Sequence, residues 1–229
     1  GGPAGGRLDE DEAEDAWQLL RAAVAQREAE EGMEESDSVL RRVQREAGFP
    51  EACPVHRLDY ATSGCLAVAL TQEGASDISL QWRKRTVDKA YEAVVAGVVA
   101  DDEGLIDKAL LRVDAVKRSG DPSRVEVVDD DVPGAKLSLS SYKVLARSDT
   151  ATVLDLTPHT GRLHQLRAHC KALGHPIVGD WLYGTGDANR LCLHASRLAF
   201  DDPALGERVR VASAASWELS EPPELVYVS

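Results

Sequence analysis

The sequence predicts an α+β fold in which helices flank a largely antiparallel sheet. Segments with helical and strand patterns follow one another without the βαβ alternation that builds parallel sheets, and no segment repeats along the chain. Residues 135–146 and 151–157 read as two strands joined by a short turn at Ser148 and Asp149, which favours an antiparallel pair. A chain of 229 residues is long enough to bury the core that such a sheet needs.

Helical spacing of apolar residues occurs in four segments, namely 13–31, 37–47, 75–85 and 161–173. In the last segment, Leu163, Leu166 and Cys170 fall at i, i+3 and i+7, on one face of a helix. Thr160 is the natural N-cap of this helix and Gly174 its natural end. We therefore expect the helix to begin directly after Thr160.

Strand patterns occur in eight segments, namely 65–70, 89–97, 105–111, 124–128, 135–146, 151–157, 191–195 and 208–212. The first is short and apolar and follows a glycine turn, which predicts a buried strand. In the second, Tyr91, Ala93 and Val95 recur at every second position, which is the period of a strand. Residues 105–111 and 124–128 are weaker candidates on either side of a polar loop at 117–123.

The net charge of −13 argues against general nucleic-acid binding, because contacts with phosphates need Lys and Arg. The charge is uneven, since residues 1–50 contain thirteen acidic and six basic residues. Basic side chains gather near two later segments and comprise Arg83, Lys84, Arg85, Arg162 and Lys171. Nucleic acid would therefore have to bind in a local basic groove.

Two stretches carry the residues most suited to chemistry. Residues 56–64 read HRLDYATSG, and residues 160–169 read TGRLHQLRAH, followed by GHPIVGD at 174–180. Asp59 lies between apolar segments, where an unpaired carboxylate is costly to bury, so it needs a cation. Arg57 and Arg167 are the candidates. A nearby arginine favours the charged carboxylate, which is the form able to act as a nucleophile.

These stretches resemble the RluA-type pseudouridine synthases, whose motifs read HRLD-x-x-TSG, G-R-x-H-Q-(I/L)-R and GHPI-x-GD. The resemblance implies a pseudouridine synthase fold, with a mixed sheet and a central catalytic cleft. It also implies isomerisation of uridine to pseudouridine in structured RNA. Asp59 occupies the place of the catalytic aspartate, which acts as nucleophile or base, and Arg167 that of the arginine in a salt bridge with it.

Further residues take roles from the same resemblance. Tyr91 lies in KAYEA, similar to the family's K-x-Y-x-A motif, and corresponds to the tyrosine that stacks on the target base. Leu166 would close the other face of the pocket. Arg57 would fill the space left when the uridine leaves its stack. The alternative for Arg57 is an ion pair with Asp59 or with a phosphate.

Arg162, His164 and Gln165, within the second motif, are the remaining expected substrate-binding residues. No cofactor and no metal are expected, because the isomerisation needs only an ionised carboxylate. The four histidines at 159, 164, 169 and 175 are five or six residues apart, so neighbours do not share a helix face as zinc ligands would.

The resemblance also sets the expected organisation and partners. We expect a catalytic domain over 38–229, with 1–37 as a Gly-rich start and an acidic helical insertion at its edge. Because the chain begins with Gly1, we expect a processed or shortened form. RNA is the expected partner, either tRNA or rRNA, with a ribosomal or ribonucleoprotein particle as a further possibility. No apolar run reaches the ~20 residues of a membrane span, so we expect no membrane partner and an intracellular protein, with cytoplasm, nucleus and organelle left open.

Two alternatives remain open at this point. The chain could be a weakly active or inactive pseudouridine-synthase-like component that binds RNA or helps to assemble a ribonucleoprotein particle. It could instead be a glycosidase, which would need a second carboxylate about 5–10 Å from Asp59. Asp155 and Asp180 are the candidates for that second carboxylate.

Overall fold

The computed structural model describes residues 39–45, 48–113, 123–186, 188–203, 206–217 and 226–227. The chain divides into two compact units. One contains the described part of Gly1–Val55 together with Val68–Ser79, and the other contains His56–Ala67 and the described part of Leu80–Ser229. The predicted helix at 13–31 and the whole of segment 1–37 lie outside the described residues. Within the ranges described, no helix is both long and apolar enough to cross a membrane.

The first unit contains helix α2 (Val39–Arg45) and a short antiparallel pair of strands, β1 (Cys53–Pro54) and β3 (Val68–Ala69). The predicted helix at 37–47 is therefore confirmed in its central part. The predicted strand at 65–70 is wrong in extent. The chain changes partner within it, because β3 pairs with β1 whereas the preceding strand β2 (Ser63–Gly64) pairs elsewhere.

Helix α3 (Gln72–Lys84) begins in the first unit and continues into the second. It starts three residues before the predicted segment 75–85. Thr71 causes the earlier start, because its Oγ1 accepts a hydrogen bond of 3.1 Å from the backbone N–H of Gly74 and so caps the first turn. Ile78 of this helix is buried.

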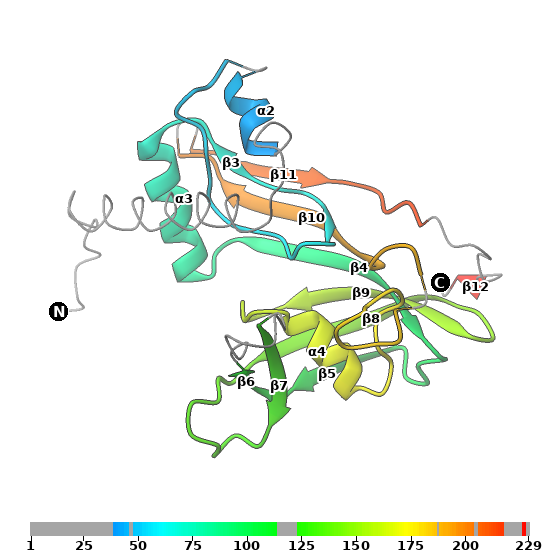
Figure 1. The fold of residues 1–229 in the computed structure, drawn as a ribbon. Coiled ribbons are helices and arrows are strands. Elements are labelled where there is room, and N and C mark those ends of the chain that lie inside the picture. Colours follow the sequence, from blue (N-terminus) through cyan, green and yellow to red (C-terminus); the bar gives the residue numbers. More distant parts are fainter. Residues whose placement is uncertain are drawn as a thin grey trace. The chain divides into compact units, whose positions relative to one another are not determined.

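The second unit is organised around a large sheet. Its strands are β2, β4 (Asp88–Ala96), β5 (Glu103–Asp107), β8 (Leu139–Arg147), β9 (Ala151–Pro158), β10 (Leu193–Asp201), β11 (Arg208–Ala212) and β12 (Val226–Tyr227). The main path runs β11-β10-β4-β9-β8-β12, with β5 paired to β8 and β2 paired to β10 (Figure 1). Every pairing is antiparallel except that of β2 with β10. The predicted α+β fold with a largely antiparallel mixed sheet is confirmed.

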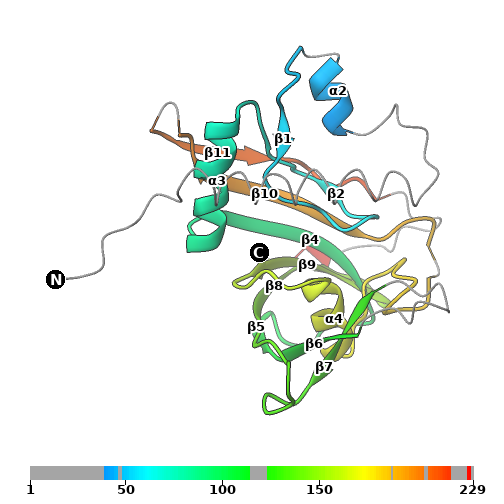
Figure 2. The same ribbon diagram turned by 60° about the vertical axis from the view of Figure 1, so that its left-hand side comes forward.

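A separate hairpin is formed by β6 (Ala109–Val113) and β7 (Arg124–Val128). The single strand predicted at 105–111 is thus two strands, because β5 pairs with β8 while β6 pairs with β7. Helix α4 (Gln165–Ala172) lies beside this hairpin in both ribbon views (Figures 1 and 2). Leu110, Val125 and Ala168 are buried together in the small core between them.

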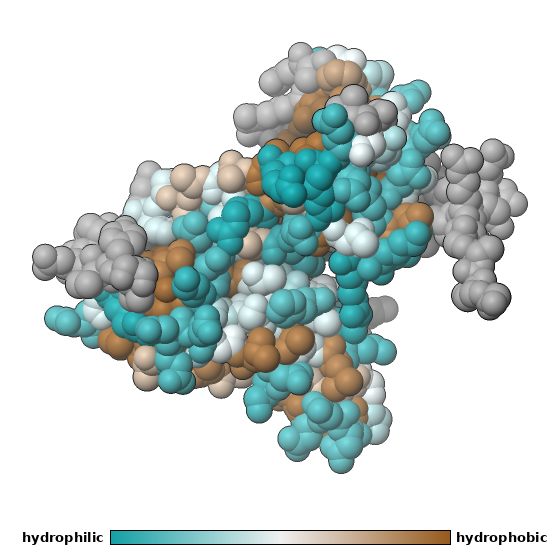
Figure 3. All heavy atoms as spheres, turned by 180° about the vertical axis from the view of Figure 1, so that it is seen from behind, coloured by the Kyte–Doolittle hydropathy of each residue, from teal (hydrophilic) through white to brown (hydrophobic). Residues whose placement is uncertain are grey.

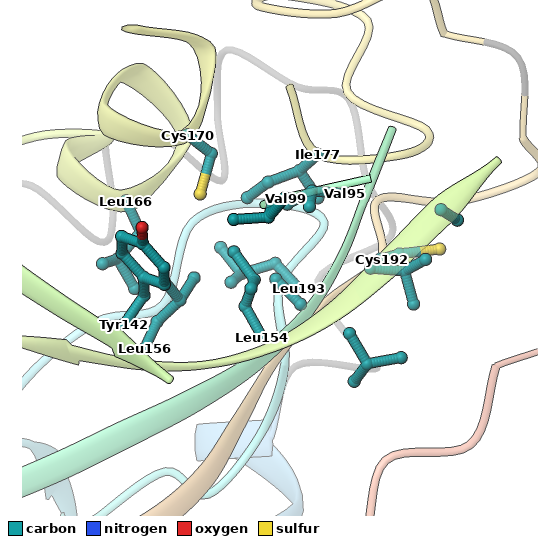
Figure 4. Packing of buried hydrophobic residues seen from close by; sticks show 14 of the residues in the cluster. Val95, Val99, Tyr142, Leu154, Leu156, Leu166, Cys170, Ile177, Cys192 and Leu193 are labelled. Carbon is teal, nitrogen blue, oxygen red and sulfur yellow. The ribbon is translucent and has the colours of Figure 1, made fainter. Parts of the chain in front are cut away.

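The main core of the second unit covers one face of the central strands. Leu166 and Cys170 of α4 lie near Leu154 and Leu156 of β9 in this cluster (Figure 4). Burial of these side chains fixes α4 against the sheet by the hydrophobic effect. On the face shown in Figure 3, exposed apolar side chains form small groups separated by hydrophilic ones.

Candidate active site

Asp59 lies in a loop, His56–Ala67, which we call the Asp59 loop. The two ends of this loop are tied together, because the backbone N–H of Ala67 donates to His56 Nε2 at 2.9 Å. Asp59 itself opens a tight turn in which its carbonyl accepts from the N–H of Thr62 at 2.9 Å. Burial, and next the positive charge of Lys89, lower the pKa of His56 to about 4, so the ring stays neutral and keeps Nε2 free to accept.

The far end of the Asp59 loop is joined to β10. Gly64 has φ of +109° and lies so close to Ala195 that any Cβ would overlap the carbonyl oxygen of Ala195. That same oxygen accepts from the N–H of Cys65 at 2.8 Å. A glycine is therefore required at this position of the TSG motif, both for its backbone conformation and for the close approach.

The Asp59 carboxylate faces two side chains of the second motif. Arg167 Nη1 lies 4.0 Å from Asp59 Oδ2, and His164 Nε2 lies 4.0 Å from Asp59 Oδ1. The Asp59 side chain keeps 21% of its surface exposed, whereas that of Arg167 keeps 6%. Asp59 is therefore a reachable carboxylate beside a buried cation.

Arg167 makes its shortest bonds with a different carboxylate, that of Asp180. Its Nε and Nη2 donate to the two oxygens of Asp180, both at 2.8 Å. Asp180 is fully buried, and its Oδ1 also accepts the backbone N–H groups of Leu182 and Tyr183 at 3.0 Å. The Arg167 guanidinium lies 5.1 Å above the ring of Tyr183. Asp180 and Tyr183 therefore fix the position of the Arg167 guanidinium that faces Asp59.

The pKa shifts agree with this arrangement. Burial alone would lower the pKa of Arg167, but the bonds and charge of Asp180 outweigh it and raise that pKa. Burial would likewise raise the pKa of Asp180, yet Arg167 and the two backbone N–H groups lower it. Both groups are therefore charged at neutral pH. The expected salt bridge from Arg167 to Asp59 is present only as a contact at 4.0 Å, since the strong pairing belongs to Asp180.

Tyr91, on β4, is the third expected catalytic residue. Burial, with a further contribution from the negative charge of Asp59, raises its pKa to about 12. Its hydroxyl therefore stays protonated at neutral pH. The negative charge of Asp59 acts on the Tyr91 hydroxyl, and the stacking role given to Tyr91 stays a prediction.

The start of α4 differs from the prediction. The helix begins at Gln165, after His164 in a left-handed conformation with φ of 47°. Thr160 is not the cap, because its hydroxyl donates to Gln165 Oε1 at 2.7 Å and accepts from the N–H of Leu139. The left-handed backbone conformation at His164 is uncommon for a residue other than glycine. It occurs directly before α4, at the residue whose side chain lies 4.0 Å from Asp59.

Gln165 was expected to bind substrate, but its amide makes four bonds to protein atoms. Its oxygen accepts from Thr160 and from the N–H of Arg162, and its nitrogen donates to the Leu139 carbonyl and to Ser140 Oγ. An amide offers two donors and an oxygen with two lone pairs, so all are used. These bonds favour a structural role for Gln165 in shaping the 160–164 turn.

His164 combines strain with partial burial. Its Nδ1 lies 3.2 Å from the hydroxyl of Tyr183, and that hydroxyl accepts the N–H of Val125. Burial lowers the pKa of His164, while the charge of Asp59 opposes the shift. His164 is therefore mostly neutral at pH 7 and stands between the Asp59 carboxylate and the β6–β7 hairpin.

The other expected substrate-binding residues differ in exposure. Arg57 is exposed and makes no ion pair among the residues that the structure describes, and the alternative of a pair with Asp59 is not observed. Arg162 is also exposed, with Nη2 3.5 Å from the carbonyl of Leu137. Leu166 is buried in the core (Figure 4). The substrate roles given to these three residues stay predictions.

A groove of about 880 Å³ lies over β10, β4 and β9, and Arg162, which opens the turn before α4, lines it. Its basic lining residues are Arg83, Arg85, Lys89, Arg162, Arg197 and Arg210. Lys84 and Lys171, expected from the sequence to contribute, are not among them. Arg197 is already neutralised by Asp155, with Nη2–Oδ distances of 2.9 and 2.7 Å. The other five cations form no ion pair with the residues that the structure describes.

Two groups important for this site were not assigned by sequence reasoning. Asp180 was named only as a candidate second carboxylate of a glycosidase, yet it is the buried counterion of Arg167. The need for a second partner could have been inferred from Arg167. A buried guanidinium has five N–H donors, which is more than the Asp59 carboxylate alone can satisfy. Tyr183, which contacts both Arg167 and His164, lies outside the recognised motifs. In the described ranges, no cluster of three or more His, Cys, Asp or Glu side chains could hold a metal ion.

Comparisons with known proteins agree with this geometry. The RNA pseudouridylate synthase family profile matches residues 22–172. A dual-specificity RNA pseudouridine synthase RluA of Yersinia pestis is 42% identical over 178 residues, which cover 76% of this chain and 82% of that protein. The protein of the same name from Escherichia coli K12 is 38% identical over 197 residues, covering 80% and 82%.

A solved structure is also similar. Human RNA pseudouridylate synthase domain containing 1 superposes with a TM-score of 0.66 at 33% identity, covering 78% of this chain and 74% of that one. The match to the family profile extends over most of the chain and includes the Asp59 loop and α4, which contribute residues to the site. The chain therefore belongs to the RNA pseudouridylate synthase family and is an RluA-type member of it.

Proposed function

We propose that Asp59 carries out the reaction by which this chain, as a member of its family, converts uridine in RNA to pseudouridine. The observation that supports this role most strongly is the pairing of a partly exposed Asp59 carboxylate with Arg167, a buried cation that Asp180 holds in place. An ionised carboxylate can react with a substrate when it is accessible and its oxygens are not all hydrogen-bonded to a cation.

The reaction exchanges one bond of the ribose for another. The C1′–N1 bond breaks with its electron pair going to N1, the uracil rotates, and C5 forms the new bond to C1′. C5 then loses its proton, and N1 is protonated, so atoms and electrons balance without an oxidant. Asp59 can begin the reaction by attacking C1′, and C5 then displaces the carboxylate when it bonds to C1′. It can instead remove the proton at C2′, which returns to C2′ as C5 bonds to C1′. Both routes need the ionised carboxylate.

The neighbouring side chains suit a uridine that has left its stack. Tyr91 keeps a neutral aromatic ring close to Asp59, where it can stack on the base. Arg57 is exposed on the same loop as Asp59 and can fill the space that the base leaves. Leu166 lies under the site as part of the core and supports its floor.

The basic groove accounts for how an acidic protein binds RNA. Arg83, Arg85 and Lys89 line it from α3, the turn after it and β4, and Arg162 joins them from the turn before α4. We infer that this groove holds the phosphates that flank the target uridine. Because Lys84 and Lys171 do not line the groove, reversal of charge there should matter less than reversal inside it.

A matched pair of variants tests the groove. Arg85→Glu places a negative charge in the groove, whereas Lys171→Glu makes the same change in net charge outside it. RNA affinity should fall in Arg85→Glu, with the slope of log affinity against log salt reduced by about 1. Equal loss in both variants would mean that only the total charge matters and would contradict the proposed path.

The substrate class follows from the relatives. Several are described as dual-specificity RNA pseudouridine synthases, so we propose that this chain also accepts more than one RNA, drawn from tRNA and rRNA. The alternative of an inactive assembly component has no support in the residues described, since Asp59, Tyr91 and Arg167 lie together. The glycosidase alternative fails for Asp155 and Asp180, which are bound to Arg197 and Arg167.

Mapping of pseudouridine in total cellular RNA tests the proposed function. RNA lacking the modification is incubated with the wild-type protein or with Asp59→Ala, and modified positions are mapped. The wild type should modify a small set of uridines in more than one RNA class, and Asp59→Ala should modify none. A set confined to one class would contradict the dual specificity alone, whereas no wild-type product would contradict the activity.

A further inference from the structure

Ser63, at the end of the Asp59 loop, is the centre of a polar network. Its Oγ lies 2.8 Å from His194 Nδ1 and also accepts a short hydrogen bond from Arg190 Nη2. On the other side of the imidazole ring, His194 Nε2 lies 3.1 Å from the carbonyl oxygen of Ser213. Ser63, the neighbouring pair Arg190 and His194, and Ser213 are therefore linked in one chain of hydrogen bonds.

The direction of each bond in this network can be assigned. Arg190 can only donate, so Ser63 Oγ accepts from it. The Ser213 carbonyl oxygen can only accept, so His194 Nε2 carries a proton and donates it there. In the tautomer with its proton on Nε2, Nδ1 accepts the hydroxyl proton of Ser63. Each bond of the network then has one donor and one acceptor.

The network is partly shielded from water, because Ser63, Arg190 and Ser213 are half-buried. His194 is buried, and the ring of Trp217 lies at a centroid distance of 6.2 Å from it in an edge-to-face arrangement. The guanidinium of Arg190 lies 5.7 Å from the centre of the same ring. None of Ser63, Arg190 and His194 lines the basic groove.

Arg190 also touches the segment that holds Arg167. Gly179, which directly precedes Asp180, packs so closely on Arg190 that a Cβ there would overlap the Arg190 carbonyl oxygen. The side chain of Arg190 thus binds the end of the Asp59 loop, while its backbone contacts the segment that carries Asp180. One residue connects the carboxylate side of the active site with the cation side.

We propose that Ser63, His194 and Arg190 are positioning residues that set the placement of Asp59 relative to Arg167 and thereby control the rate of isomerisation rather than RNA affinity. This proposal rests on the function proposed for Asp59. Gly64 and Cys65 are bound to β10 by their backbones, but Asp59 lies several residues earlier, beyond a single turn. Ser63, the residue between that turn and Gly64, also pairs with β10 by its backbone, and the side-chain network adds a second attachment to it.

Two substitutions of His194 separate its two bonds. The amide of His194→Asn lies where Nδ1 was and can accept from Ser63. The amide of His194→Gln reaches the position of Nε2, so it keeps the bond to Ser213 and leaves Ser63 without its acceptor. Misplacement of a reacting group by about 1 Å can cost up to about 100-fold in rate. For a partial shift we expect kcat to fall about tenfold in His194→Gln and less than about threefold in His194→Asn.

Single-turnover kinetics, RNA affinity and hydrogen exchange are measured together. Ser63→Ala should match His194→Gln, the double variant should be no slower than either alone, and RNA affinity should stay at the wild-type value. The amides of Thr62 and Cys65 should exchange faster in His194→Gln than in His194→Asn. This exchange readout does not depend on activity, so it separates failure of this proposal from failure of the proposed function.

Several results would overturn the proposal. An equal kcat in His194→Gln and in the wild type would overturn it. So would equal rate losses in the Gln and Asn variants, if those losses were proportional to the decrease in melting temperature. If both His194 variants fail to fold, Ser63→Thr, which keeps the hydroxyl, is compared with Ser63→Ala. Equal rates in those two would show that the hydroxyl positions nothing.

Discussion

The two halves of the active site are built in opposite ways. Arg167 and Asp180 form a buried pair in which both carboxylate oxygens and two of the guanidinium nitrogens are used. Asp59 stands on a loop held by the His56–Ala67 bond and by its pairing with β10, and its carboxylate faces Arg167 and a mostly neutral His164, each at 4.0 Å. The difference indicates that the cation is fixed by the protein while the carboxylate keeps lone pairs free for the substrate.

This contrast has an energetic side. A buried ion pair is costly to break, because removing one partner leaves the other charge unpaired in a poorly solvated place. A partly exposed carboxylate 4 Å from its nearest cation contributes little to stability. The pair of Arg167 and Asp180 should therefore contribute mainly to folding stability, and Asp59 mainly to the rate of the reaction. The variants below test this division.

Asp180→Ala should have the largest effect on stability. It leaves buried Arg167 without its bidentate partner and removes the acceptor of two backbone N–H groups, so we expect a loss of about 3–5 kcal/mol. Denaturant unfolding of the wild type and variant measures this loss. A loss below about 1 kcal/mol would show that the pair is not the fixed half of the site.

Asp180→Asn is the matched control, because it keeps shape and one acceptor oxygen while removing charge. The pKa of Asp180 is lowered in the folded protein, so its stabilisation is present above the pKa of an unfolded Asp, about 3.9. It is lost as pH falls through the lower pKa of the folded state. The stability difference between wild type and Asp180→Asn should therefore be constant above about pH 5 and shrink below about pH 4.

Two double-mutant cycles compare the partners of Arg167. The cycle of Arg167→Ala with Asp180→Ala should give a coupling energy of about 3 kcal/mol, whereas the cycle with Asp59→Ala should give less than about 1 kcal/mol. The distances of 2.8 and 4.0 Å predict this order. Equal couplings would mean that Arg167 is shared evenly between the two carboxylates.

His56, at the neck of the Asp59 loop, should make stability depend on pH. Its folded pKa of about 4 lies below that of an unfolded histidine, about 6.5. Stability from the neutral ring is thus complete above pH 6.5 and is lost as pH falls to 4, by about 3 kcal/mol. His56→Gln can still accept from Ala67 but does not titrate, so its unfolding free energy should lack this decline. The same decline in both proteins would remove His56 as its cause.

Chelation should have the smallest effect of all. Neither half of the site needs a metal ion for the chemistry described, so EDTA should leave the rate of pseudouridine formation unchanged. Magnesium is tested separately on RNA folding, because it can act through the substrate. Loss of activity in EDTA with recovery in zinc would contradict a mechanism carried by Asp59 alone.

The sequence predicted the contents of the site better than its connections. Asp59, Tyr91 and Arg167 were chosen because their segments resemble the motifs of a known family. The structure brings Asp59 and Arg167 to 4.0 Å, and the catalytic roles of all three stay predictions. The start of α4 could not, because the left-handed backbone at His164 is set by bonds from Gln165 to Leu139 and Ser140, which are distant in sequence. Asp180 was missed as the partner of Arg167 for the same reason.

The fold shows the same limit. Long strands such as β4 and β9 were predicted near their true bounds, because a period of two over many residues is a strong local pattern. The apolar run at 65–70 failed as a strand because its neighbours pair with two different strands. The apolar pattern of a segment does not indicate with which strands its residues will pair.

Single-turnover isomerisation by Asp59→Asn tests the catalytic role of Asp59 most directly. The amide keeps the size of the side chain and removes its charge, so the rate should fall more than about 1,000-fold. RNA affinity and the unfolding free energy should stay within about 0.5 kcal/mol of the wild type, since the cation is held by Asp180. A rate within tenfold of the wild type would contradict the assignment of Asp59 as the residue that reacts with the uridine.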